Sequence, residues 1–252
     1  DLLHLYAERQ LDLAPKHSLD SSLMKEFEED FHYQETPDQL LAISSIKEDL
    51  QGSKPMDRLV SGDVGYGKTE VAMRAAFKSV VDGGGQVALL VPTTVLAMQH
   101  FDTFSERMKG YPVEVRVLSR FQKAKENKKT LEDLQKGKVD ILIGTHRILS
   151  KDVNFSRLTL MIIDEEQRFG VRAKEALKKR KKSVHALSLS ATPIPRTLYM
   201  SLIGARDVSV MATPPQDRLP IKSILAEYEY ELFNNAIFRE MARKGQAFFI
   251  HN

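Results

Sequence analysis

The sequence of 252 residues contains no cysteine. Disulfides, zinc sites built on thiolates and cysteine nucleophiles are therefore excluded, and this composition fits a reducing cytoplasm. No apolar run approaches the roughly 18 residues that a membrane-spanning helix needs, and the N-terminus lacks a secretory signal pattern. We therefore expect a cytoplasmic protein that has no membrane partner.

The sequence also lacks a strong excess of charge of either sign. Lysine and arginine number 37 against 34 aspartate and glutamate residues, which gives a net charge of +3. This excess is too small to predict a nucleic-acid partner by itself. Residues 123–136 and 178–182 are rich in lysine, but each segment taken alone is more typical of a solvated helix face.

Short apolar segments alternate with helical segments through most of the chain. The predicted strands cover residues 58–61, 87–91, 113–118, 139–143, 158–163 and 186–189. The predicted helices among them cover residues 68–81, 94–109, 122–135 and 171–181. This alternation predicts an α/β fold, a mostly parallel sheet covered by helices on both faces. Ligands of such folds bind at the carboxyl ends of the strands.

The two ends of the chain depart from this alternation. Helical spacing predicts helices over 2–14 and 22–31, and Thr36-Pro37 predicts the start of another helix through Leu50. Towards the C-terminus, a helix over 230–243 and a strand over 246–250 are predicted. The expected domains are a connecting helix (1–20), an ATP-binding lobe (21–212), and a linker with the first helix and strand of a second lobe (213–252). Because the chain starts at Asp1 without methionine, we expect a piece of a longer protein.

A glycine-rich segment follows the first predicted strand of the lobe and precedes a helix. It matches G-x-x-x-x-G-K-[ST] and comprises Gly62, Asp63, Val64, Gly65, Tyr66, Gly67, Lys68 and Thr69. Its backbone N–H groups and the helix N-terminus favour phosphate, Lys68 reaches the β- and γ-phosphates, and the Thr69 hydroxyl ligates Mg²⁺. A chance glycine-rich turn is the alternative, which this position between strand and helix disfavours. The segment predicts binding of ATP or GTP.

The predicted strand 158–163 ends in the carboxylates Asp164 and Glu165. Asp164 can hold Mg²⁺ through water, and Glu165 can polarise the attacking water as a general base. Acidic residues at a strand end are common, so this pair alone is weak evidence for a function. The pair becomes informative because a phosphate loop precedes it in the sequence. Together the two motifs predict a nucleotide hydrolase rather than a passive nucleotide binder.

Further motifs resemble those of superfamily-two helicases. They are Pro92-Thr93-Thr94 with Gln99, Gly144-Thr145-His146, Asp164-Glu165-Glu166-Gln167 and Ser190-Ala191-Thr192. The resemblance implies a RecA-like P-loop lobe in which Gln39 reads adenine, the ring of Phe31 packs on the base, and the nucleotide is ATP.

The same resemblance implies contacts to DNA phosphates and residues that couple ATP state to DNA grip. The DNA candidates are Thr93, Thr94, Ser119, Arg120, Thr145 and His146. The coupling candidates are Gln167, Arg168, Ser190, Thr192 and Arg196. Alternatives stay open: Thr94 can be a helix N-cap, His146 a metal ligand, and the two arginines structural ion pairs.

Longer segments resemble one helicase family in particular. Residues 62–77, 164–171 and 191–198 are similar to bacterial transcription-repair coupling factors, with RecG helicases as near relatives. Gln167 departs from that family, in which histidine is the commoner residue. The resemblance implies a double-stranded DNA translocase that acts on stalled RNA polymerase and recruits excision-repair proteins through domains absent from this chain.

Three other functions compete with this interpretation. A RecG-like fork-remodelling helicase would use the same lobe with other accessory domains. A metabolic kinase or transport ATPase shares the phosphate loop but lacks the helicase motifs in this order. A non-catalytic nucleotide-gated module is disfavoured by Glu165. In the helicase interpretation the arginine finger lies in the second lobe, so we expect this chain alone to bind ATP, hydrolyse it slowly and not translocate.

Overall fold

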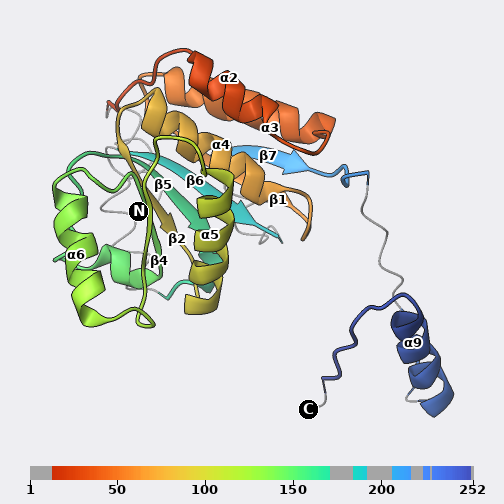
Figure 1. Ribbon diagram of the computed structural model, residues 1–252. Coiled ribbons are helices and arrows are strands. Elements are labelled where there is room, and N and C mark those ends of the chain that lie inside the picture. The colour runs from red at the N-terminus through yellow and green to blue at the C-terminus, as the bar shows by residue number, and fades with distance from the viewer. Residues whose placement is uncertain (1–12, 171–183, 192–205, 217–223, 228, 251–252) are drawn as a thin grey trace. The chain divides into compact units, whose positions relative to one another are not determined.

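The computed structural model describes residues 13–170, 184–191, 206–216, 224–227 and 229–250 (Figure 1). The chain divides into two compact units, Asp1–Gln216 and Asp217–Asn252, and each is described by itself. The predicted helix over 171–181 and nearly all of the one over 2–14 lie outside the described residues. Within the described residues, no helix combines the length and apolarity that crossing a membrane requires.

The first unit is built on one sheet of seven parallel strands in the order β3-β4-β2-β5-β6-β1-β7. The strands are β1 (Asp57–Gly62), β2 (Gln86–Leu90), β3 (Val115–Leu118), β4 (Ile141–Gly144), β5 (Leu158–Asp164), β6 (His185–Ser190) and β7 (Asp207–Met211). The predicted α/β class and all six predicted strands are confirmed. The edge strand β7 was not predicted.

Alternating side chains of the strands give the sheet two apolar faces. In β5, Leu160 and Ile162 belong to one buried cluster, whereas Met161 and Ile163 belong to the other. The first cluster includes residues of α2 (Ser22–Glu29), α3 (Pro37–Gln51), α4 (Lys68–Val81) and α5 (Thr94–Arg107). The second includes residues of α6 (Ala124–Gln135) and of the 3-10 helix η1 (His146–Leu149). Helices therefore cover both faces, as the sequence predicts.

Side-chain caps fix where α3 and α5 begin. Thr36 caps α3, because its hydroxyl accepts from Gln39 N at 3.2 Å while Gln39 Oε1 accepts from Thr36 N at 2.9 Å. This capping box confirms the predicted start. In α5 the cap is Thr93, whose hydroxyl accepts from Leu96 N at 3.2 Å. The alternative that Thr94 is the N-cap is therefore wrong, since Thr94 is the first helical residue.

Residues 13–20 form no helix, which corrects the part of the predicted connecting helix that the structure describes. They run as a strap at the amino-terminal end of the sheet. Ala14 N donates to Ser53 O at 3.0 Å, and His185 at the start of β6 lies 2.9 Å from Pro15 O through Nε2. His17 is buried, and burial lowers the pKa of His17 to about 4. These contacts make the strap part of the lobe.

The described part of the second unit contains one helix, α9 (Tyr230–Ala242), which confirms the predicted helix. The predicted strand over 246–250 is wrong, because these residues are irregular in the structure. Phe249 instead contacts Phe233 of α9, with ring centroids 5.2 Å apart. A strand needs a neighbouring strand for its backbone hydrogen bonds, and the described residues of this unit provide none.

Candidate functional site

The carboxyl ends of all seven strands lie at one edge of the sheet, because the strands are parallel. The register places the catalytic candidates there. Asp164 of β5 pairs with Leu189 of β6, and Leu189 pairs with Val60 of β1. The predicted carboxylates therefore come level with the end of β1, from which the phosphate loop departs.

The phosphate loop connects β1 to α4. Gly65 and Gly67 each have φ of 82°, the left-handed conformation that glycine adopts without cost. Lys68 Nζ donates to Gly62 O at 2.6 Å and to Asp63 O at 2.9 Å. The ammonium group is thus held by the loop's own carbonyl groups, at the place where it would meet phosphate oxygens.

Gln39 lies directly against this loop. Its Nε2 donates to Tyr66 O at 2.9 Å, and a Cβ atom added to Gly67 would lie 2.4 Å from Nε2. Gln39 is buried and also belongs to the capping box of α3. The structure therefore joins Gln39 to the phosphate-binding backbone, whereas its recognition of adenine stays a prediction.

Phe31, the predicted stacking partner of the base, has other neighbours. The guanidinium of Arg74 lies 5.1 Å from its ring centroid, and the ring of Tyr33 lies 5.6 Å away. Phe31 lines a cavity of about 510 Å³ bordered by α2, α3 and α4. Gln39 is not among the described residues that line this cavity. The stacking role of Phe31 stays a prediction.

The two carboxylates after β5 have different partners. Asp164 Oδ2 lies 3.0 Å from His100 Nε2 of α5. Glu165 has φ of 51°, an unusual value for a residue with a side chain. Its Oε1 accepts from Ala191 N at 3.2 Å, and its Oε2 accepts from Gln167 Nε2. Glu165 thus joins the end of β5 to the segment that follows β6.

The coupling candidates are only partly brought together. Gln167 reaches Glu165 directly, and Ser190 is buried at the end of β6. Arg168 is exposed in the 3-10 helix η2 (Glu166–Arg168). Thr192 and Arg196 lie outside the described residues.

The residues at this edge fit a magnesium ion. Thr69 follows the loop at the start of α4, and Asp164 ends β5. The Thr69 hydroxyl and the Asp164 carboxylate are both oxygen donors of the kind that Mg²⁺ prefers. The described residues contain no group of three or more histidine, aspartate or glutamate side chains that could hold a metal ion. Such a sparse set fits an ion that keeps water and nucleotide phosphates as its other ligands.

The carboxyl ends of β2, β3 and β4 border a second feature, a cavity of about 600 Å³. It is lined by Pro92, Thr93, Thr94, Leu118, Ser119, Arg120, Asn127, Thr145, His146 and Arg147. All six predicted DNA contacts are therefore in one place, although they come from three separate segments of the sequence. The described residues of the lining include arginine and hydroxyl side chains and no carboxylate, which suits an anionic partner.

Comparison with known proteins identifies the family of the chain. The family model of DEAD/DEAH box helicases matches residues 36–201. The chain belongs to the DEAD/DEAH box helicase family. The chain is also similar to a solved structure, that of RecG bound to a three-way DNA junction. The match covers 99% of this chain and 35% of the RecG chain, with 31% identity and a TM-score of 0.81.

Curated relatives show which helicases this chain is similar to in sequence. The transcription-repair-coupling factor of Bacillus subtilis (strain 168) is 55% identical over 252 residues, which are 100% of this chain and 21% of that protein. The factor of Staphylococcus aureus (strain USA300) is 52% identical over the whole chain and 22% of that protein. This helicase lobe therefore spans about a fifth of the length of these relatives.

Several functional candidates of this helicase lobe were missed from sequence. Asn127 and Arg147 line the cavity beside the predicted contacts, and Asn127 Nδ2 donates to Ser119 O at 2.9 Å. Arg206, before β7, lies 3.2 Å from Glu166 and 3.0 Å from Asp57. Among the residues that sequence analysis missed, only His100 could have been identified from the sequence, because it is a polar residue on the apolar face of a predicted helix.

Proposed function

We propose that this chain is the ATP-binding and hydrolysing lobe of a cytoplasmic double-stranded DNA translocase that removes stalled RNA polymerase in transcription-coupled DNA repair. The observation that carries the proposal is the placement of the phosphate loop, its carboxylates and the cavity with all six predicted DNA contacts along one sheet edge. Similarity to transcription-repair-coupling factors over the whole chain supports this choice among helicases.

In the proposed reaction, Lys68 leaves the carbonyls of Gly62 and Asp63 and binds the β- and γ-phosphates. Thr69 and Asp164 would hold Mg²⁺, which would neutralise charge that develops on the phosphates. Glu165 accepts the proton of the water that attacks the γ-phosphorus, while the bond from that phosphorus to the β–γ bridging oxygen breaks and ADP leaves. The Glu165 carboxylate accepts from Ala191 N and Gln167 on different oxygens, and its remaining lone pairs would accept a hydrogen bond from water.

The hydrogen bond from Ala191 N gives the proposed coupling a physical basis. Ala191 follows β6 directly, so a shift of the segment after β6 changes a hydrogen bond of the general base. We assign the coupling role to Gln167, Arg168, Ser190, Thr192 and Arg196 on this ground and on their helicase motifs.

DNA would lie across the cavity at the ends of β2, β3 and β4. The hydroxyl groups of Thr93, Thr94, Ser119 and Thr145, with Arg120 and His146, would contact backbone phosphates rather than bases. Such contacts give affinity that is independent of sequence and falls as salt rises. RNA polymerase and excision-repair proteins would be bound by regions outside this chain.

The decisive experiment uses a protein with the full length of the curated relatives. We expect it to displace a stalled RNA polymerase in an ATP-dependent manner, and its Lys68→Ala form to fail. Displacement that survives Lys68→Ala contradicts the proposed motor. The 252-residue chain alone should bind ATP, hydrolyse it slowly and show no translocation.

RecG-like fork remodelling is the second candidate function, and the TM-score of 0.81 to the RecG structure favours it. The same full-length protein distinguishes the two functions. ATP-dependent regression of a model replication fork without displacement of RNA polymerase would establish the RecG-like alternative.

A further inference from the structure

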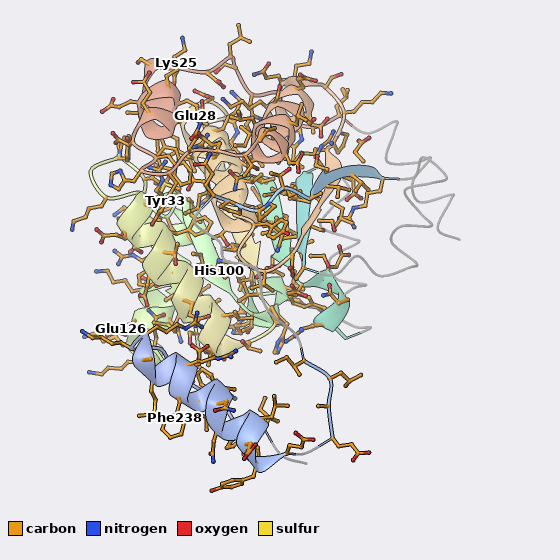
Figure 2. The ribbon with its side chains drawn as sticks, turned by 90° about the vertical axis from the view of Figure 1, so that its right-hand side faces the viewer. Lys25, Glu28, Tyr33, His100, Glu126 and Phe238 are labelled. Atoms are coloured by element: carbon orange, nitrogen blue, oxygen red, sulfur yellow. The ribbon has the colours of Figure 1, made fainter. Side chains whose placement is uncertain are left out.

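His100 occupies an unusual position for a polar side chain. It belongs to the buried face of α5 together with Ala97 and Phe104, and only 9% of its surface is exposed. Its ring meets that of Phe104 edge-on at 6.2 Å, which limits its rotation. Figure 2 labels His100, which comes from α5 and approaches the sheet with Nε2 3.0 Å from Asp164 Oδ2.

The chemistry of this contact determines what His100 can do. An ionised carboxylate only accepts hydrogen bonds, so Nε2 carries the proton and donates it to Oδ2. The bond fixes the rotation of the carboxylate and leaves Oδ1 for a metal ion or its water. Partners of this kind orient metal ligands, and their loss commonly costs 10- to 100-fold in metal affinity or activity.

The helix that carries His100 also reaches the other ligand surface. Thr93 caps α5, and both Thr93 and Thr94 line the cavity of the predicted DNA contacts. His100 follows Thr93 by two turns, roughly 10 Å along the helix axis. A phosphate bound at the N-terminus of α5 would therefore contact the same helix whose His100 holds Asp164.

We propose that His100 is a positioning residue that links the nucleic-acid surface to the magnesium carboxylate through α5. It sets the orientation of Asp164, and DNA bound at Thr93 and Thr94 alters that orientation. The inference rests on the proposed function, because it requires Asp164 to serve Mg²⁺.

Titration of Mg²⁺ against binding of a fluorescent ATP analogue to the 252-residue chain tests the first half of the inference. His100→Leu removes the donor and should raise the midpoint Mg²⁺ concentration about tenfold, while binding in EDTA stays unchanged. His100→Gln keeps an N–H donor and should recover most of the wild-type midpoint. Thr103→Leu, on the exposed side of α5, is the matched control and should behave as wild type. Thermal unfolding of each variant shows whether the fold is retained.

Asp164→Asn separates failure of the inference from failure of the proposed function. If Asp164→Asn raises the midpoint and neither His100 variant does, His100 does not position the carboxylate. If Asp164→Asn leaves the midpoint unchanged, the magnesium role in the proposed function is wrong.

Duplex DNA tests the link through α5. Addition of a short duplex should shift the Mg²⁺ midpoint of the wild type and leave that of His100→Leu in place. Equal responses of the two proteins would contradict the link.

Discussion

The sheet edge has two halves that differ in how far their polar groups are already paired. In the half formed by β5, β6 and β1, Lys68 binds loop carbonyls, Asp164 binds His100, and Glu165 binds Ala191 and Gln167. The half formed by β3, β4 and β2 instead opens into a cavity of about 600 Å³, where Arg120 and His146 are exposed.

This difference indicates two ways of binding an anion. In the first half a ligand meets side chains that hydrogen bonds already hold in place, so each side chain has a defined role and its loss is costly. In the second half a ligand adds contacts to a surface that is already open, so affinity spreads over many groups. Substitutions in the first half should therefore reduce binding or activity more than substitutions in the second half. Four predictions test this difference.

The largest effect is expected from Glu165→Gln. Glutamine cannot accept the proton of the attacking water, so ATP hydrolysis by a full-length protein should fall about 100-fold or more. Binding of a fluorescent ATP analogue should change little. Equal losses in binding and in hydrolysis would show that Glu165 serves the ground state and not the chemical step.

Lys68→Ala should weaken MgATP binding about 100-fold, because a charge-assisted contact to two phosphates is lost. Fluorescence titration of the 252-residue chain measures this loss. Lys109→Ala removes a lysine whose side chain is 75% exposed and serves as control. DNA affinity without nucleotide should be the same in all three proteins, and a parallel loss of DNA binding would mean that the two halves are not separate.

Gly67→Ala and Gly110→Ala isolate the role of the loop backbone. Both glycines have positive φ, so alanine should cost about 1–2 kcal/mol of unfolding free energy at either position. Only at Gly67 does the added Cβ meet Gln39, whereas at Gly110 nothing lies within 4 Å. Denaturant unfolding should show the smaller loss for Gly110→Ala, and ATP binding should fail only in Gly67→Ala. Intact ATP binding in Gly67→Ala would contradict the joint role of loop and Gln39.

Arg120→Ala should have the smallest effect, a loss of about fivefold in affinity for duplex DNA, with the slope of log affinity against log salt reduced by about 1. Fluorescence anisotropy at several salt concentrations measures both quantities. Arg116→Ala, in β3 shortly before Arg120, removes an exposed arginine outside the cavity and is the control. If the two variants lose affinity equally, net charge and not the cavity determines DNA binding.

The sequence predicts which residues form the nucleotide site better than it predicts which other residues contact them. Lys68 is recognisable because phosphate chemistry requires a lysine at the end of the loop, and Asp164 and Glu165 because metal and water chemistry require carboxylates at the end of a strand. The bond between His100 and Asp164 joins residues 64 positions apart and depends on how α5 packs against the sheet. Sequence patterns indicate that His100 lies on a buried face, but not which residue it meets.

Three features of local structure were predicted wrongly or not at all. In one, two neighbouring residues could each cap a helix, and in the others the strand pattern was weak or a neighbouring strand was needed. Thr93 and Thr94 can both cap a helix, and only the extended backbone of Thr93 (φ −130°) decides between them. Strand β7 is an edge strand with a half-exposed, mixed sequence that gives a weak pattern. Residues 246–250 have the aromatic character of a strand but no strand beside them in the described part of their unit.

The strap at residues 13–20 has a mechanical consequence. It is held at the amino-terminal end of the sheet by Ser53, Leu50 and His185, and the two strands next to these residues, β1 and β6, end at the phosphate loop and at Ala191. A force applied to this strap would act on the amino-terminal ends of both strands. The lobe can thus receive a pull at one end of its sheet while both its ligand surfaces lie at the opposite end.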